Sequence, residues 1–367
     1  MYDPQFLQKI IDLLTNSKEE MFLILLHFCN NFLNTKNLLK KEEIEKICTL
    51  ILKSEFTYRI IDIEASDYIT AIFKYNIQLF SLNLLKEIAI FETKILSSDD
   101  LPIEIINNSL SILSQIVKYS DLINTILENL NILRLIEYLS YTSDLIQEST
   151  LKIMCDLTTK KEIAKILVYE DILSTLIGML KFLYNKNTAT LCIILISNCV
   201  IDDYSIRQVI EGGIIQIISD NFLENDTEVK VVCIYIIQAI LQNLVNVSII
   251  EQLVEEKCFE VFFEFLKLRY EEVGYLIMDS LYYFLDQISE GWLKSVLLEH
   301  FEKIGLVEIL NEKYNSITNS TFSSLIEKFL SKFYHYNEEE FAYSMKQLSS
   351  KKLKPQKISP CDFKIGD

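Results

Sequence analysis

The chain has 367 residues, half of them hydrophobic, with only 7 Gly and 4 Pro. No proline occurs between Pro102 and Pro355, and few sheet-based folds could form their turns with so little Gly and Pro, so the composition predicts helices joined by short turns. The formal net charge of −17 makes nucleic acid and anionic membranes poor partners and favours a basic peptide or protein patch. The same charge also serves to keep a hydrophobic chain soluble.

The eight cysteines and three histidines show no spacing typical of a zinc site, and no C-x-x-C pair occurs. The cysteines are therefore predicted to be buried, reduced thiols in a cytosolic or nuclear protein. Phosphate-binding, nucleophile-elbow and metalloprotease motifs are absent from the sequence. We therefore expect no catalytic residue, no metal and no cofactor, and predict that the protein is not an enzyme.

Two segments bear on targeting and membranes. Met1–Pro4 lacks the basic and apolar regions of a signal peptide. Val231–Ile250 is uncharged over 20 residues, the length of a membrane span. Its polar residues are costly in lipid: Gln238, Gln242, Asn243 and Asn246. We therefore predict a buried helix that runs into a turn and a following helix.

A strongly apolar helix that ends in a polar residue and a turn recurs along the chain. In order, its copies are Leu26–Phe32, Thr70–Ile77, Ser109–Val117, Thr150–Leu157, Ala189–Val200, Val231–Ile240 and Val273–Leu285. Their alignment gives one equivalent position, occupied by Asn31, Asn76, Gln115, Asp156, Asn198, Gln238 and Tyr283. The mean spacing of 42 residues between these positions is in the range of armadillo and HEAT repeats, which have two or three helices per unit.

Each unit also contains a second apolar helix, as in Ile214–Ile218, Phe259–Leu266 and Leu306–Leu310. No single unit can bury its apolar faces alone, so we expect neighbours to stack into one core whose innermost helices line a concave groove. The predicted fold is an all-α, right-handed superhelical solenoid of the armadillo/HEAT type. It comprises seven or eight units in residues 1–335, followed by a partly disordered C-terminal tail in residues 336–367.

Four segments resemble the importin-α (karyopherin-α) family. Ala189–Asn198 looks like its helix E-A-C-W-x-I-S-N, and Ser205–Ile218 is similar to the continuation Q-I-Q-x-V-I-D-A-G-x-I-P-x-L-V. Ile249–Phe262 resembles I-R-Y-L-V-E-Q-G-C-I-K-P-L, and Phe301–Leu310 looks like the last unit, F-I-E-K-A-G-G-x-x-K-I. The order and spacing match from roughly Phe6 to Tyr334, at low identity.

The resemblance implies a nuclear transport adaptor. In the family, the Asn of W-x-x-x-N clamps the backbone of an extended peptide, and the Trp one turn earlier walls a slot for a lysine stem. It implies that an acidic groove binds basic nuclear localisation signals of protein cargo, with importin-β or an exportin as further partners, in cytoplasm and nucleus. The peptide-binding residues would be Asn31, Asn76, Gln115, Asp156, Asn198 and Gln238.

The sequence departs from this pattern in three respects. Asp156 only accepts hydrogen bonds, and Tyr283 lacks an amide. No Trp remains at the seven Trp positions, which hold His27, Ile72, Ser111, Lys152, Ile194, Ile234 and Asp279. Met1 falls at the start of what looks like the third unit, so these residues do not support importin-β binding.

Two alternatives therefore stay open. The chain could be an armadillo scaffold or chaperone cofactor that binds a folded partner, and the Asn residues could be helix caps. The tail also contains the run Lys351–Lys354, K-K-L-K, which fits the K-K-x-K form of a localisation signal.

Overall fold

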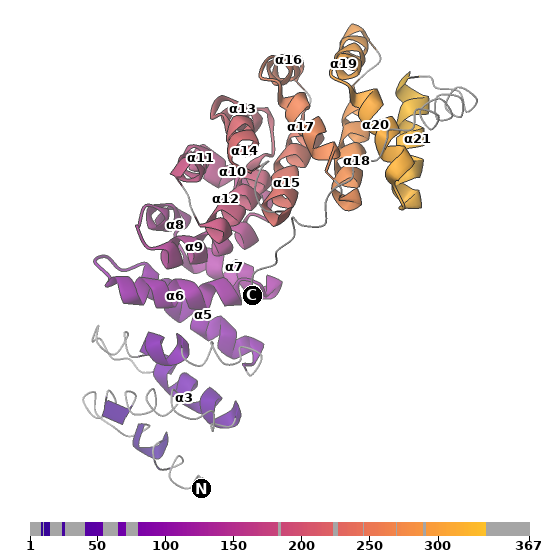
Figure 1. The fold of residues 1–367 in the computed structure, drawn as a ribbon. Coiled ribbons are helices and arrows are strands. Elements are labelled where there is room, and N and C mark those ends of the chain that lie inside the picture. The colour runs from indigo at the N-terminus through magenta and orange to yellow at the C-terminus, as the bar shows by residue number, and fades with distance from the viewer. Residues whose placement is uncertain are drawn as a thin grey trace, which may run out of the picture. The chain divides into compact units, whose positions relative to one another are not determined.

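The computed structural model describes residue 9 and residues 11–14, 24–25, 41–53, 65–70, 80–182, 185–222, 227–244, 246–268, 270–288 and 291–334. The regular elements within these ranges are all α-helices (Figure 1), which confirms the predicted all-α class. The chain divides into two compact bodies: Met1–Phe222 with Asp226–Ala239, and Leu223–Asn225 with Ile240–Asp367. The predicted tail and the predicted site residues Asn31 and Asn76 lie outside the described residues.

A three-helix repeat recurs from Ser120 to Tyr334. Repeat A contains α7 (Ser120–Asn129), α8 (Ile132–Leu139) and α9 (Asp144–Leu157). Repeat B contains α10 (Lys161–Tyr169), α11 (Ile172–Phe182) and α12 (Lys186–Cys199). Repeat C contains α13 (Asp203–Glu211), α14 (Ile214–Phe222) and α15 (Thr227–Asn243). Repeat D contains α16 (Val247–Glu255), α17 (Cys258–Leu266) and α18 (Glu271–Gln287), and repeat E contains α19 (Trp292–Lys303), α20 (Leu306–Ser316) and α21 (Ser320–Tyr334).

Successive repeats begin 41, 42, 44 and 45 residues apart, which confirms the predicted period. Before repeat A lie α3 (Lys41–Lys53), α5 (Leu82–Leu96) and α6 (Ile103–Ile116). The apolar segments predicted between Ser109 and Leu285 coincide with α6, α9, α12, α15 and α18, the third helices of their units. Three helices per repeat, with this period, define an armadillo-type solenoid.

Local signals separate the helices within a repeat. Asp202 caps α13, since its carboxylate accepts from the Ser205 amide while the Ser205 hydroxyl reaches back to the Asp202 backbone. Repeats B to E each place a residue with positive φ directly before the second helix: Asp171 (59°), Gly213 (74°), Lys257 (56°) and Gly305 (86°). This left-handed residue ends the first helix and redirects the chain into the second.

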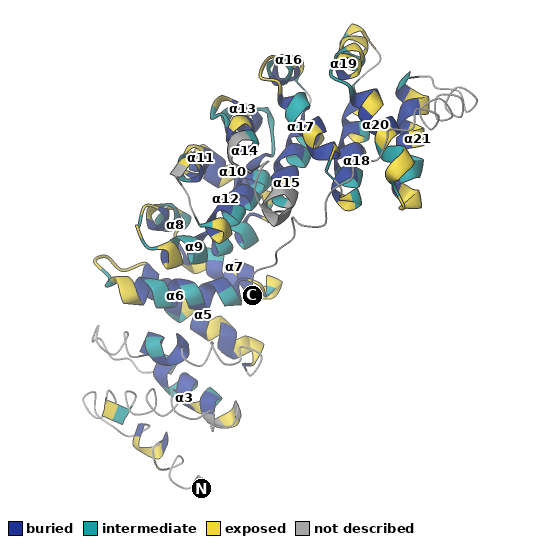
Figure 2. Ribbon diagram, viewed as in Figure 1, coloured by how far each residue is buried: buried dark blue, intermediate teal, exposed yellow. Residues whose placement is uncertain are grey.

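The core of the first body is built mainly from Ile and Leu side chains. Figure 2 shows the buried residues of its helices in dark blue. The third helices α6, α9 and α12 pack against one another in sequence, α6 on α9 and α9 on α12. Their inward-facing side chains are fully buried, for example Leu113, Ile153 and Ile196. Burial on this scale, not helix propensity, stabilises the stack, because a short isolated helix is marginal in water.

The core of the second body is rich in phenylalanine. The Phe301 ring lies 4.8 Å from the Phe259 ring and 5.3 Å from the Phe263 ring, centroid to centroid. Helix α21 packs on α18, where Phe322 lies against Gly274. A Cβ at position 274 would come within 2.6 Å of the Phe322 ring, so the close approach of the two helices requires glycine there.

The uncharged stretch Val231–Ile250 is divided between two helices. Helix α15 ends at Asn243 and α16 begins at Val247, which confirms the predicted turn. Asn246 caps α16 by accepting from the Ser248 amide at 3.0 Å. Within the described ranges, no helix combines the length and apolarity needed to cross a membrane.

Candidate peptide-binding site on the third helices

Three of the predicted site residues occupy one equivalent place in the first body. Gln115, Asp156 and Asn198 are each the next-to-last residue of their helices, α6, α9 and α12. Each is partly exposed. Because these helices pack in sequence, the side chains form a row of polar groups, one per unit.

The surface around this row follows helical spacing. Residues four and eight positions before each row member share its face. We call these nine residues the ladder face: Asn107, Ser111, Gln115, Glu148, Lys152, Asp156, Thr190, Ile194 and Asn198. All are partly exposed, so the face is accessible and mostly polar.

Asn198 holds two adjacent repeats together. Its Nδ2 donates to the Cys155 carbonyl at 3.3 Å and to the Thr158 hydroxyl at 3.0 Å. Cys155 is among the last four residues of α9, whose carbonyls lack partners within the helix. The Oδ1 of Asn198 accepts no hydrogen bond from any described residue. The amide therefore caps a helix with one end, and its other end remains able to accept from a peptide N–H.

Gln115 and Asp156 are less constrained. Nε2 of Gln115 makes a long hydrogen bond of 3.4 Å to the Ser111 carbonyl. The Asp156 carboxylate accepts no hydrogen bond from the described residues, and burial raises its pKa while the charge of Lys118 lowers it. Both side chains therefore retain acceptors for a ligand.

The charged groups on and beside the ladder face largely offset one another. Lys152 stands where the importin-α pattern has Trp, and its ammonium pairs with the Glu148 carboxylate one turn earlier at 2.6 Å. Lys118 offsets part of the Asp156 charge. The acidic groove that the resemblance implies is therefore not found on this face, which is polar and close to neutral.

On α15 the exposed residue that precedes Gln238 by about one turn is Tyr235, not the aligned Ile234. Ile234, assigned to a Trp position from the sequence, is completely buried, whereas Tyr235 is 42% exposed. Gln238 is partly exposed three residues after Tyr235, so both lie on the accessible side of α15. Sequence alignment missed Tyr235 because it lies inside a continuous apolar run, where periodicity cannot distinguish the two registers.

A second surface lies on α18 in the second body. We define the Tyr/Asp face as its partly or fully exposed residues Tyr275, Asp279, Tyr282, Tyr283 and Asp286. Tyr283, which the sequence alignment placed at the Asn position, is 48% exposed. Aromatic rings beside carboxylates suit cationic side chains. The signal in the sequence was the helical spacing of Tyr and Asp, which a search for Trp and Asn does not detect.

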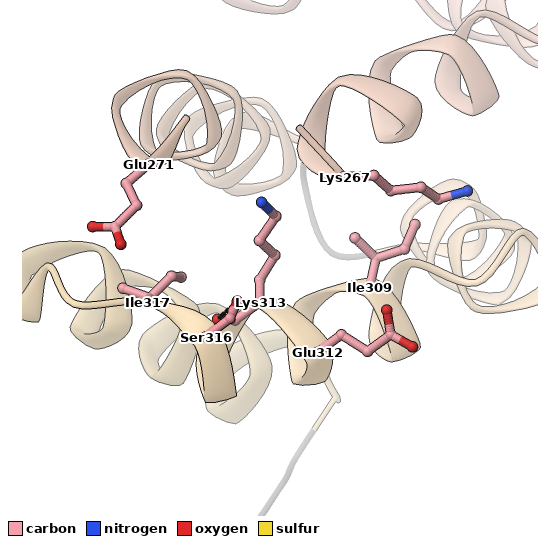
Figure 3. Close-up of a pocket in the computed structure, with 7 residues that line it drawn as sticks. All are labelled: Lys267, Glu271, Ile309, Glu312, Lys313, Ser316 and Ile317. Carbon is pink, nitrogen blue, oxygen red and sulfur yellow. Dashed lines mark hydrogen bonds between the residues drawn. The ribbon is translucent and has the colours of Figure 1, made fainter. Parts of the chain in front are cut away.

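A cavity of about 540 Å³ lies between repeats D and E in the second body (Figure 3). Its lining consists of Lys267, Glu271, Ile309, Glu312, Lys313, Ser316 and Ile317. The Glu271 carboxylate accepts from the Thr318 amide at 2.8 Å and from the Asn319 amide at 3.0 Å, and these bonds hold its pKa below the ordinary value. Lys313 donates to the Leu268 carbonyl, and desolvation lowers its pKa. The polar groups of this cavity thus fasten one repeat to the next.

The described cysteines are buried or half-buried free thiols. Burial raises the pKa of Cys192 and Cys199 to about 12. Among the described residues, no group of three His, Cys, Asp or Glu side chains is placed to hold a metal ion.

No protein-family model matches the sequence, and no curated protein matches it significantly. Among solved structures, an engineered protein from the Northeast Structural Genomics Consortium is similar with a TM-score of 0.65 and 14% identity, over 94% of this chain and 92% of that one. A second engineered protein from the same consortium gives a TM-score of 0.50 at 16% identity, over 64% of this chain and 96% of that one. A designed armadillo repeat protein in complex with the peptide (KR)4 gives 0.46 at 16% identity, over 76% and 99%.

At these identities a structural likeness shows the fold alone. The structural likeness extends over nearly the whole chain, and it agrees with the three-helix repeats on the fold class. The protein is therefore an armadillo-type repeat solenoid.

Proposed function

We propose that the protein binds an extended peptide segment of a partner protein along its third helices, as a scaffold without a catalytic step. The observation that carries this proposal is the row formed by Gln115, Asp156 and Asn198. One residue with an available side-chain acceptor lies at the same place on three helices that pack in sequence. An extended peptide offers backbone N–H groups at regular intervals, which such a row can receive.

The partner that we propose is a lysine-rich segment, such as a nuclear localisation signal. The net charge of −17 attracts a basic peptide over long range. On α18 of the second body, exposed tyrosines and aspartates form a separate surface that suits lysine side chains. Nuclear transport, residence in cytoplasm and nucleus, and contacts with importin-β or an exportin are the further parts of this proposal, and they are supported by the sequence resemblance.

The test is a calorimetric titration with octalysine, acetylated and amidated at its ends, at low salt. The ladder face lacks Trp walls and is close to neutral, so we expect weak binding, at about the micromolar level or −8 kcal/mol. The affinity should fall as salt rises, because the attraction is electrostatic. Octaglutamate of the same length is the control and should not bind.

Absence of octalysine binding would favour the alternative scaffold, whose groove binds a folded partner. Equal binding of octalysine and octaglutamate would also contradict the proposal, since a surface that selects lysine must discriminate charge.

A further inference from the structure

Lys332, on the terminal helix α21, is bound by the Tyr/Asp face of α18. Its ammonium pairs with the Asp286 carboxylate and donates to the Tyr282 hydroxyl at 3.2 Å. The same ammonium lies 4.7 Å from the centroid of the Tyr282 ring and 5.4 Å from that of Phe333. A carboxylate and an aromatic ring one helical turn apart on α18 thus hold a single lysine side chain between two rings.

The contact is favourable but open to exchange. The hydrogen bond to Asp286 raises the pKa of Lys332, and the same bond holds the pKa of Asp286 below its ordinary value. The two side chains remain 41% and 47% exposed. An ion pair with this exposure stabilises a protein only slightly, so another cation can displace Lys332.

We propose that Tyr282, Asp286 and Phe333 form a slot for one lysine side chain, which Lys332 fills in the free protein and a lysine of a lysine-rich partner takes over. This inference rests on the proposed function, because it assumes a lysine-rich partner. The slot already binds a lysine of this chain, which shows which chemistry it accepts. Lys332 therefore competes with the partner and weakens its binding.

Lys294 is the other cation near the slot. Its ammonium lies 5.2 Å from the Phe333 centroid, donates to the Ile288 carbonyl at 3.4 Å, and also lowers the pKa of Asp286. It forms no ion pair with Asp286 within 4 Å among the described contacts, so Lys332 is the occupant.

The first experiment measures octalysine affinity of the full chain after Lys332→Ala. Emptying the slot should tighten binding by about two- to five-fold, the factor that corresponds to a surface ion pair. Lys303→Ala is the matched control, since it removes the same charge from an exposed pair with Glu299 that no aromatic ring flanks. Adding Asp286→Asn to Lys332→Ala should abolish the gain. Equal affinities of the Lys332→Ala and Lys303→Ala variants would overturn the proposal.

The second experiment detects the occupied slot without any peptide. Acetylation by N-hydroxysuccinimidyl acetate, followed by mass spectrometry, should modify Lys332 more slowly than Lys303, and Asp286→Asn should remove that protection. Equal modification rates in the parent protein would overturn the proposal. If octalysine binds but Lys332→Ala has no specific effect, the slot is wrong while peptide binding stands. If Lys332 is protected and neither parent nor variant binds octalysine, the proposed function and the slot's role in it fail together.

Discussion

Asn198 caps a helix of the preceding repeat, and in the proposed function it also clamps the peptide, so it can combine the two roles that the sequence left open. Its NH2 group bonds to Cys155 and Thr158 of the preceding repeat, whereas its Oδ1 is available. The two ends can be separated by mutation. Asn198→Asp removes the donor but keeps an acceptor, and Asn198→Ala removes both.

We therefore expect both Asn198 variants to lose about 1 kcal/mol of unfolding free energy, the value of one net hydrogen bond. Only Asn198→Ala should also weaken octalysine binding, by about five-fold for the same reason. Chemical denaturation and calorimetry measure the two quantities. Unchanged stability in both variants would show that the bonds to Cys155 and Thr158 contribute nothing.

Lys257 adopts a backbone conformation that suits glycine. Its φ is 56°, in the turn where repeats C and E have Gly213 and Gly305. Left-handed backbone costs a residue with a Cβ about 1 to 2 kcal/mol, so Lys257→Gly should raise the unfolding free energy by about 1 kcal/mol. Gly213→Ala should lower it by a similar amount, since a Cβ there meets no atom within 4 Å and only the backbone is strained. Denaturant titrations of both variants test the sign of each change.

The buried thiols predict a dependence on alkaline pH. Burial raises the pKa of Cys192, Cys199, Cys233 and Cys258 from an ordinary value near 9 to about 12. In the unfolded chain these thiols ionise near pH 9, whereas in the folded protein they ionise near pH 12. Their contribution to the free energy of unfolding is therefore complete below pH 9 and is lost as pH rises toward 12. Melting temperatures measured from pH 8 to 11 should fall, and alkylation of the native thiols should be slow. Fast alkylation without unfolding would contradict this burial.

At the scale of helices, α18 and α21 can pack closely because Gly274 has no side chain where the Phe322 ring lies. In Gly274→Ala the new Cβ would lie 2.6 Å from the Phe322 ring, and overpacking of this kind costs about 1 to 3 kcal/mol. Gly178→Ala in α11 is the matched control, because its Cβ meets nothing within 4 Å, and it should gain up to about 1 kcal/mol. Thermal melts compare the two. A Gly274→Ala protein as stable as its parent would contradict the close packing.

Periodicity predicted the second and third helices because each carries a strong apolar stripe, as in Phe259–Leu266 and Ala189–Val200. The first helices were not individually predicted. They are short, such as α13 with nine residues, and their clearest signals are local: the cap at Asp202 and the turn residue Gly213. Local capping chemistry carries this information better than hydrophobicity does.

The site was less predictable than the fold. Gln115, Asp156 and Asn198 could be aligned because their helices end at equivalent positions. Tyr235 could not be placed, since a one-residue shift in an apolar run leaves the pattern unchanged while exchanging buried and exposed positions. The pairing of Lys332 with Asp286 joins residues 46 positions apart, and sequence spacing within one helix does not reveal it.

At the scale of the whole molecule, the net charge of −17 and the near-neutral ladder face have different consequences. Long-range attraction by the acidic chain raises the rate at which a basic peptide arrives. In the proposed function, the side-chain acceptors of the ladder face receive the peptide backbone, and the Tyr/Asp face, a separate surface of the second body, receives a lysine side chain. Salt should therefore weaken the overall affinity without removing the contribution of the ladder face.

The ladder face tests the central claim, that peptides bind along the third helices. A triple variant removes its row: Gln115→Ala, Asp156→Ala and Asn198→Ala. The control removes one carboxylate, one amide and one hydroxyl from other exposed positions of the first body, all in repeat B: Glu162→Ala, Thr175→Ala and Asn187→Ala. Both variants are first confirmed as folded by circular dichroism. Calorimetric titration with octalysine at low salt should then show affinity about 30- to 150-fold weaker for the ladder variant, as expected for two to three lost hydrogen bonds of about 1 kcal/mol. The control should bind as the parent does, and equal affinity of the two triple variants would contradict the account.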